Sequence, residues 1–211
     1  MTALWNRIFR KPVRPPIQEI VSHFNEAARD EEHFPSTIDP RIYHVQLILE
    51  YFGDLKGKRV LDVGCGKGRF ARVFLERYPQ AGIVAFDLAE SMLRYVSPGT
   101  APCAGSMTAL PFASESFDSA YATESLEHAV DIESAVAEMC RVVKPGGRIV
   151  IIDKNIEQWG KLKTPEWEQW FGRKQLEKML ARHCHQVSSR PISYWEDVAP
   201  DGLFLAWLAE K

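Results

Sequence analysis

The stretch VLDVGCGKGRF, from Val60 to Phe70, is the part of this 211-residue chain that indicates the fold most directly. Its apolar beginning predicts a buried strand and the residues after Gly68 predict a helix, so the glycines fall at a strand-to-helix turn. Glycine allows positive φ and close approach of the backbone to a ligand, while a helix N-terminus offers free N–H groups. The stretch therefore predicts a ligand-binding turn at the edge of a sheet.

Strand and helix patterns alternate along the rest of the chain. Continuous apolar strands that alternate with helices predict an α/β domain whose parallel sheet is covered by helices on both faces. Asp201-Gly202 is typical of a hairpin turn between the last two strands, and Asp131 can cap a helix. The predicted strands cover 59–63, 83–86, 101–104, 117–122, 148–152, 186–195 and 203–209, and the predicted helices cover 17–30, 42–52, 71–78, a short segment through 92–93, 132–143 and 173–183.

The length fits one structural domain, in which we distinguish two parts. Residues 1–52 hold an N-terminal arm and two helices that we expect to cap one end of the sheet, and residues 53–211 form the core. Residues 1–16 carry cations and no acid, and we expect a flexible arm or a small packing helix there. The alternative is that Trp5, Ile8 and Phe9 touch an anionic membrane surface.

Composition excludes several classes of protein. With 26 basic and 28 acidic residues the net charge is -2, so no overall charge favours nucleic-acid binding. No apolar run is long enough to span a bilayer, and we expect neither stable membrane insertion nor a signal peptide. The four cysteines show no CxxC spacing, which favours a reduced, cytoplasmic compartment. We expect a monomer or a homodimer.

The acids around the glycine turn indicate which ligand it binds. Asp87 ends the next predicted strand, 19 positions after Gly68, where a carboxylate can accept hydrogen bonds from both hydroxyls of an adenosine ribose. A nicotinamide dinucleotide would require GxGxxG, whereas this turn reads GxGxG, and Asp62 would repel a pyrophosphate. Asp62 suits an ammonium group instead. Adenosine joined to an amino acid without phosphate describes S-adenosylmethionine (SAM).

Four blocks of sequence resemble the class I SAM-dependent methyltransferases, in their broad bacterial small-molecule (type 11-like) branch. The resemblance covers about residues 40–155 and implies a Rossmann-like, seven-stranded, mostly parallel sheet with an antiparallel last strand. Residues 53–211 would then form the SAM-binding core, with the acceptor side in its C-terminal region. The blocks are VLDVGCGKG at 60–68, VAFDLAESML at 84–93, GSMTALPFASESFD at 105–118 and ATESLEHAVDIESAVAEMCRVVKPGGRIVIID at 122–153.

The resemblance also implies which residues contact the cofactor. The family usually has Gly-Asp where this chain has Gly105-Ser106, so Ser106 would accept one hydrogen bond from the adenine amino group in place of an acid. The residues assigned in this way are Asp62, Gly64 and Gly66 at the methionine end, Asp87 at the ribose, Leu88, Met92, Ser106 and Met107 around the adenine, and in addition Cys65 and Thr123.

The implied reaction is methyl transfer from SAM to a small-molecule acceptor, which leaves S-adenosyl-L-homocysteine. We expect oxygen as the acceptor atom, followed by nitrogen or carbon. The protein mainly aligns nucleophile, methyl group and sulfur, and a base is needed only where the acceptor must first lose a proton. Two alternatives stay open: metal-assisted methylation of a catechol-type acceptor, and a SAM- or S-adenosylhomocysteine-binding protein without transfer activity.

Glu124, Glu127 and His128 are the candidates for chemistry beside the cofactor. Their E-x-x-E-H spacing resembles a pattern that helps to hold a divalent metal in polyprenyl-catechol O-methyltransferases. Three interpretations stay open: a metal site, a scaffold for the SAM loop, and a base role for His128 that would make activity fall near pH 6.5. We name His128 and Glu124 as catalytic candidates and expect no metal.

The C-terminal region is rich in aromatic and basic residues. The aromatic residues predict either the wall of a pocket for an aromatic or apolar acceptor or hydrophobic filling of the core. The basic residues suit an anionic substrate group or a solvated face, and His183-Cys184-His185 is expected at the surface and in the core rather than on a metal. The aromatic residues are Trp159, Trp167, Trp170, Phe171 and Trp195, and the basic residues are Lys154, Lys161, Lys163 and Arg173.

Overall fold

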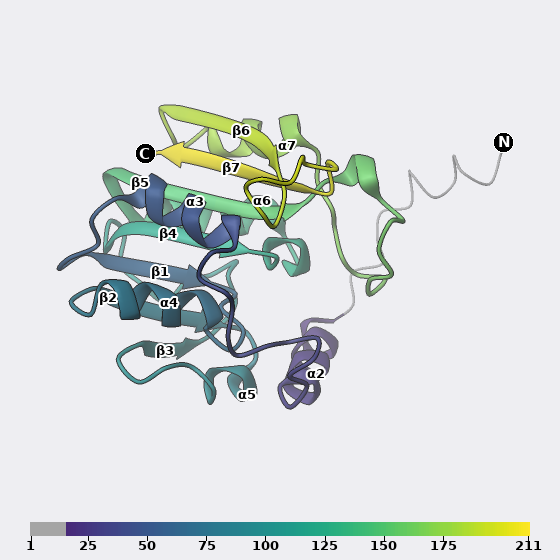
Figure 1. Cartoon of the computed structure of the whole chain (residues 1–211), viewed down its shortest axis with the longest axis horizontal. Coiled ribbons are helices and arrows are strands. Elements are labelled where there is room, and N and C mark those ends of the chain that lie inside the picture. The colour runs from purple at the N-terminus through teal and green to yellow at the C-terminus, as the bar shows by residue number, and fades with distance from the viewer. Residues whose placement is uncertain (1–15) are drawn as a thin grey trace, which may run out of the picture.

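Strand β1 (Arg59–Val63) lies near the centre of a seven-stranded sheet in the computed structural model, which describes residues 16–211 (Figure 1). The strand order is β3-β2-β1-β4-β5-β7-β6, and β7 runs antiparallel to both of its neighbours while β1 to β5 are parallel. The predicted mostly parallel sheet with an antiparallel last strand is confirmed. The other strands are β2 (Gly82–Asp87), β3 (Ala101–Ala104), β4 (Phe117–Thr123), β5 (Val143–Lys154), β6 (Gln186–Ile192) and β7 (Phe204–Glu210).

Helices cover both faces of the sheet, as the continuous apolar strands predict. On one face, aromatic side chains of α3 and α4 surround Tyr121 of β4, while α6 and α7 pack on the other face around Trp207. Asp131 caps α6 by accepting hydrogen bonds from the amides of Glu133 and Ser134, as predicted. The helices are α2 (Ile17–Ala27), α3 (Tyr43–Phe52), α4 (Arg69–Arg77), α5 (Glu90–Leu93), α6 (Ile132–Val142) and α7 (Arg173–Leu180), with short 3-10 turns η1 (Leu126–His128) and η2 (Ile156–Gln158).

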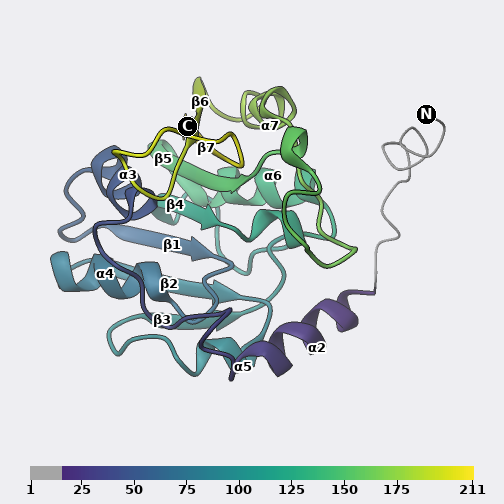
Figure 2. The same cartoon turned by 45° about the vertical axis from the view of Figure 1, so that its right-hand side comes forward.

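The two N-terminal helices lie at different places on the sheet. Helix α2 lies at the carboxyl edge of the sheet beside α5, whereas α3 packs on a sheet face (Figure 2). The reason is that α3 is apolar on several sides, so that His44, Val45, Leu47, Ile48, Leu49 and Phe52 are all buried. The division into an N-terminal part with cap helices and a core stays a prediction, and the predictions for the arm at residues 1–15 lie outside the described residues.

The predicted hairpin turn at Asp201-Gly202 is wrong. Strand β6 ends at Ile192 and β7 begins at Phe204, so residues 193–203 form a long connection rather than a two-residue turn. The connection is held against α3, because the amide of Tyr43 donates to the carbonyl of Tyr194 at 2.7 Å and the Tyr194 ring stacks on His44. This detour brings Tyr194 close to the carboxyl end of β4.

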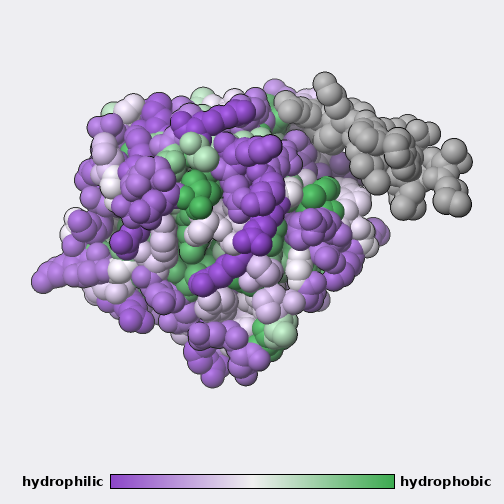
Figure 3. All heavy atoms as spheres, turned by 90° about the horizontal axis from the view of Figure 1, so that it is seen from above, coloured by the Kyte–Doolittle hydropathy of each residue, from purple (hydrophilic) through white to green (hydrophobic). Residues whose placement is uncertain are grey.

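The outer surface mixes hydrophilic and apolar side chains. From the side shown in Figure 3, hydrophilic side chains dominate and apolar side chains form separate patches between them. Trp159, Trp195 and Val198 are among the exposed large apolar residues. Within residues 16–211, no helix combines the length and the apolar character needed to cross a membrane.

Candidate functional site at the carboxyl edge of the sheet

A cavity of about 570 Å³ opens where β1, β2 and β4 end. It lies where the strand order changes direction between β1 and β4, which is the usual ligand position in an open α/β sheet. Its size suits a small-molecule ligand. Its wall is formed by the glycine turn, by residues that follow β2 and β4, by α2 and the segment after it, and by residues 162–165 with Glu168.

The glycine turn has the backbone shape that only glycine adopts easily. Gly64, Gly66 and Gly68 all have positive φ, at 71°, 53° and 74°. A Cβ atom at Gly64 would lie 2.4 Å from Cβ of Ser125, whereas one at Gly66 would meet nothing within 4 Å. Packing therefore requires glycine at position 64, while Gly66 faces open space in the cavity wall.

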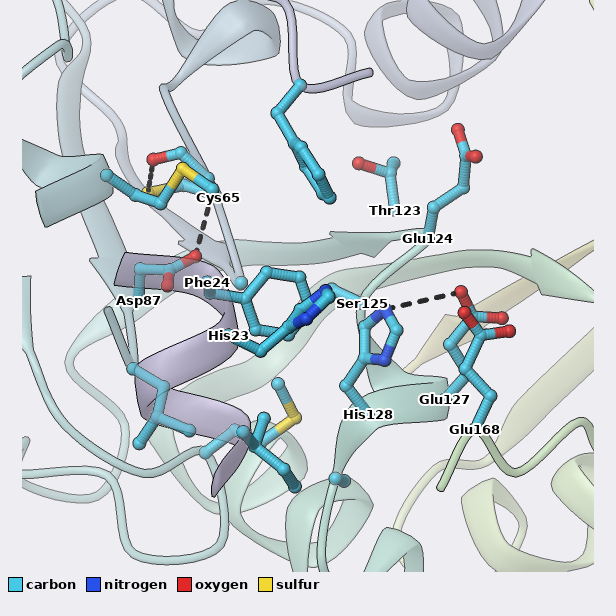
Figure 4. Close-up of a pocket in the computed structure, with 18 of the residues that line it drawn as sticks. His23, Phe24, Cys65, Asp87, Thr123, Glu124, Ser125, Glu127, His128 and Glu168 are labelled. Atoms are coloured by element: carbon cyan, nitrogen blue, oxygen red, sulfur yellow. Dashed lines mark hydrogen bonds and ion pairs between the residues drawn. The ribbon is translucent and has the colours of Figure 1, made fainter. Parts of the chain in front are cut away.

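Asp87 lies beside this turn, as predicted from its place at the end of β2. The amide of Gly66 donates to Oδ2 of Asp87 at 2.7 Å, and the amide of Ala89 donates to Oδ1 at 2.8 Å (Figure 4). Burial raises the pKa of Asp87, although these hydrogen bonds act in the opposite direction. The carboxylate therefore joins the turn after β1 to the end of β2 and borders the cavity.

Asp62 is the one predicted cofactor residue that the structure does not place on the cavity wall. It is buried in β1, where its register partner is Tyr121 of β4. Burial raises the pKa of Asp62 to about 7. Strand alternation directs this side chain toward the tyrosine and away from the cavity. The predicted residues that do line the cavity are Gly64, Cys65, Gly66, Asp87, Leu88, Met92, Ser106, Met107 and Thr123.

The structure separates Glu124 from Glu127 and His128. Oε1 of Glu124 accepts from Nη2 of Arg69 at 3.2 Å and from the hydroxyl of Tyr194 at 3.1 Å. Glu124 has a positive φ of 50°, and a 3-10 turn follows, so these side chains do not share one helix face. All three residues line the cavity, but Glu124 points away from His128 (Figure 4).

The carboxylate that lies beside Glu127 and His128 is that of Glu168, whereas the sequence pattern predicted Glu124. Glu127, His128 and Glu168 each offer a ligand atom within 4.8 Å of the others. Nζ of Lys154 contacts Oε1 of Glu127 and lies 3.4 Å from Oε2 of Glu168. Glu168 lies 40 positions beyond His128 with no motif around it, so the sequence carries no signal for this contact.

His128 is too deeply buried to behave as an ordinary histidine. Burial, followed by the nearby Lys154, lowers the pKa of His128 to about 3. A lowered pKa favours the neutral imidazole, so a base role for His128 with a fall in activity near pH 6.5 stays a prediction. Its Nδ1 has no hydrogen-bond partner among residues 16–211, and Phe24 of α2 packs edge-on at 4.9 Å between ring centroids.

The aromatic part of the wall comes from residues before β3, which include Phe70 and Phe86, and not from the C-terminal region. In the described chain, none of the five aromatic residues predicted after β5 lines the cavity. Trp170 and Phe171 are buried instead, and Phe171 packs on Trp207, as the filling interpretation requires. His23, Phe24 and Phe34 provide aromatic surface in the wall, and the sequence analysis missed them.

Only some of the predicted basic residues line the cavity, and only the cysteine of the His-Cys-His run is buried. Lys154 and Lys163 line the cavity, whereas Lys161 and Arg173 do not. Cys184 is buried with its sulfur 3.8 Å from that of Cys140, while the flanking histidines are exposed. The run is therefore split between core and surface, as expected from the divergent directions of adjacent side chains.

The comparisons with known proteins agree with this architecture. The family described as "Methyltransferase domain" matches residues 61–151. The chain is 34% identical over 154 residues to a demethylmenaquinone methyltransferase of Renibacterium salmoninarum, covering 71% of this chain and 61% of that protein. It is 35% identical over 97 residues to a malonyl-[acyl-carrier protein] O-methyltransferase of Methylococcus capsulatus, covering 43% of this chain and 35% of that protein. The chain thus spans less than two thirds of the length of either relative.

Solved structures show the same fold at lower sequence identity. The crystal structure of the [4+2]-cyclase SpnF superposes with a TM-score of 0.78 at 18% identity and covers 95% of this chain and 97% of that one. A protein named as a cyclase thus shares this architecture, so the fold alone does not identify a reaction. The glycine turn, the strand order and the sequence matches together make the chain similar to the class I SAM-dependent methyltransferases.

Proposed function

We propose that the chain binds SAM in the cavity at the carboxyl edge of the sheet and transfers its methyl group to a small-molecule acceptor. The observation that carries this proposal is the hydrogen bond between the Gly66 amide and the Asp87 carboxylate. It joins a glycine turn and a ribose-binding acid in the arrangement that an adenosine ligand requires. The names of both relatives support methyl transfer.

The residues on the wall fit SAM in two groups. The glycine turn, with Gly64, Cys65 and Gly66, would receive the methionine end, where its free amides and lack of side chains allow close approach. Asp87 would accept the ribose hydroxyls. The adenine would lie among Leu88, Met92, Ser106 and Met107, and Thr123 would lie beside it at the end of β4.

When bound, SAM supplies a methyl group that its sulfonium charge already activates. The contribution of the chain is then to orient the acceptor and to exclude water, a positioning effect worth up to about 7–11 kcal/mol. Neutral His128 can accept a hydrogen bond from an acceptor hydroxyl through its unpartnered Nδ1. Glu124, held by Arg69 and Tyr194, would orient the acceptor from the other side.

The wall indicates an acceptor with an apolar or aromatic part. Ile17, Ile20 and Phe24 of α2 line the cavity together with Phe34, and Phe24 packs against His128 of η1. Such a wall favours an acceptor that has an apolar body and one polar end.

We propose oxygen as the acceptor atom, with carbon as the alternative. Transfer from SAM with an isotopically labelled methyl group, followed by NMR of the product, distinguishes a methoxy group from a methyl group on carbon.

A second candidate function is binding of SAM or S-adenosylhomocysteine without methyl transfer. The similarity to a [4+2]-cyclase favours it, because that protein has the same fold and is named for a different chemistry. Incubation with SAM and a metabolite library separates the two functions. Formation of S-adenosylhomocysteine that depends on an added metabolite supports transfer, and tight SAM binding without turnover of any metabolite supports the second function.

Calorimetric titration with SAM tests the site itself. We expect Asp87→Ala to bind SAM about tenfold or more weakly, because hydrogen bonds to a charged group contribute about 1.5–3 kcal/mol. Asp118→Ala is the matched control, because Asp118 also accepts from a backbone amide, that of Arg59, but at the opposite edge of the sheet. Equal SAM affinity in folded Asp87→Ala and wild-type protein would contradict the proposed site.

A further inference from the structure

Four ionisable residues are buried together where β4 and β5 end, beside the cavity. The side chains of Glu127, Lys154 and Glu168 are only 1%, 10% and 4% exposed, and Asp153 is fully buried. Asp153 is satisfied by the backbone, since its two carboxylate oxygens accept from the amides of Glu127 and Lys154 at 3.3 and 2.8 Å. Burial and the neighbouring Asp153 raise the pKa of Glu127, while Lys154 acts in the opposite direction and is the counter-charge that faces both Glu127 and Glu168.

The donor atoms of this cluster resemble those of a divalent-cation site. Glu127, His128 and Glu168 bring two carboxylates and one imidazole within 4.8 Å of one another. Oε2 of Glu127 and Nδ1 of His128 are buried and have no hydrogen-bond partner in the described part of the chain. Carboxylate and imidazole donors suit hard or borderline divalent cations.

Lys154 occupies the position that such a cation would need. Its Nζ contacts Oε1 of Glu127 and lies 3.4 Å from Oε2 of Glu168, and these two carboxylates are two of the three donor groups. An ammonium and a divalent cation placed between the same two buried carboxylates would repel each other strongly at low dielectric. The residues present therefore do not fit a metal ion as long as Lys154 is charged and in place.

Trp170 holds this arrangement in place. Its indole N–H donates to Oε2 of Glu168 at 2.8 Å, and Nζ of Lys154 lies 5.8 Å from the centroid of its ring. The amide of Gln169 donates to the carbonyl of Glu127 at 2.9 Å. Lys154 thus links η1 to the segment that carries Glu168 and the adjacent cavity wall.

We infer that Lys154 is the resident cation of this site: it replaces a divalent metal between Glu127 and Glu168 and prevents this chain from binding one there. Removal of the ammonium leaves two buried carboxylates without their counter-charge, which destabilises the site unless a proton or another cation neutralises them. This inference concerns metal selectivity and holds whether or not the chain transfers methyl groups.

Titration with Co²⁺, followed by visible absorption and by metal analysis after desalting, tests the inference. We expect no stoichiometric Co²⁺ in the wild-type protein, and one equivalent in Lys154→Ala with affinity at least about tenfold above wild type. Two matched variants define the site. Lys154→Arg keeps a positive charge and is expected to bind no Co²⁺, and Lys154→Ala combined with Glu168→Gln is expected to lose the Co²⁺ that Lys154→Ala gains.

Two results would overturn the inference. One is Co²⁺ binding to wild-type protein that His128→Ala abolishes, because a metal would then share the site with Lys154. The other is a folded Lys154→Ala protein, shown by circular dichroism, that binds Co²⁺ no better than wild type. If Lys154→Ala does not fold, Lys154→Gln takes its place with the same two expected outcomes, and the wild-type titration applies in either case.

Discussion

The buried ammonium of Lys67 lies 2.6 Å from Oε1 of Glu31 and 3.1 Å from the carbonyl oxygen of Asp30. Lys67 belongs to the glycine turn, and its side chain is only 1% exposed, while Glu31 follows α2. A second link joins Nε of Arg72 to the carbonyl of Ser36 at 3.4 Å. The segment after α2 is therefore fastened to the turn that we propose to hold SAM, and α2 supplies His23 and Phe24 to the wall of the same cavity.

Replacing Lys67 by methionine should release this segment. Methionine keeps most of the apolar stem but cannot donate to Glu31 or to the Asp30 carbonyl, so the backbone at 28–36 loses its contact with the turn. We expect faster amide hydrogen exchange over 17–36, weaker SAM binding and an unchanged exchange rate in β1 and β4. Lys56→Met, at an exposed turn, is the control. Unchanged exchange at 28–36 in Lys67→Met would show that the link does not hold the segment.

Gly64 and Gly66 should respond differently to alanine, although both have positive φ. At Gly64 the added methyl group meets Ser125 at 2.4 Å, and we expect Gly64→Ala to lower the free energy of unfolding by about 1–3 kcal/mol. At Gly66 the methyl group enters open space, so only the backbone conformation costs free energy, about 1–2 kcal/mol at most. Gly66→Ala should therefore stay folded and lose SAM affinity, because the methyl group occupies the cavity wall.

Urea unfolding and SAM calorimetry of both variants check this pair. Ser125→Gly in the Gly64→Ala background removes the clashing side chain and should restore part of the lost stability. The interpretation of Gly66 as a cofactor contact fails if folded Gly66→Ala, or the bulkier Gly66→Val, binds SAM as the wild type does.

Sequence alone predicts the sheet because each strand shows two signals, which are an apolar run and an interruption of that run at the end of the strand. VLDV in β1 is apolar except for Asp62 and the β-branched run in β5 is apolar, and glycine or polar residues interrupt the pattern where each strand ends. The same signals place Asp87 at the end of β2, next to the glycine turn. They fail at residues 193–203, because the contact of Tyr194 with α3 is a tertiary interaction that turn propensity does not encode.

The candidate site is less predictable because it depends on side-chain direction and on distant residues. Asp62 and Val63 are adjacent in β1, yet their side chains point to opposite faces of the sheet, because side chains alternate along a strand. Glu124 has a left-handed backbone conformation that no pattern in the sequence predicts. Glu168 meets Glu127 only because β5 and η2 return the chain to the cavity, so a motif search around E-x-x-E-H gives Glu124 as the second carboxylate in place of Glu168.

Asp131 offers a test of a feature that the sequence predicted correctly. Its carboxylate accepts from the amides of Glu133 and Ser134 and from the Ser134 hydroxyl at the start of α6. We expect Asp131→Ala to lower the free energy of unfolding by about 1 kcal/mol, and Asp131→Asn to retain most of the stability. Urea unfolding measures both changes, and SAM affinity should stay the same. Equal stabilities of Asp131→Ala and wild type would contradict the capping role.

Asp62 should make stability depend on pH in a way that asparagine removes. Burial raises its pKa from 3.8 to about 7 in the folded protein, so the folded state binds a proton that the unfolded state releases between these values. The contribution of protonated Asp62 to stability is therefore complete below about pH 4 and is lost as the pH rises to about 7, with a slope of at most about 1.4 kcal/mol per pH unit.

Asp62→Asn has no proton to lose, so its free energy of unfolding, measured in urea without SAM, should gain about 2 kcal/mol relative to wild type between pH 5 and pH 8. Asp54→Asn, at an exposed position, should show no such gain. Parallel pH profiles of Asp62→Asn and wild type would mean that Asp62 is ionised in the folded protein throughout this range.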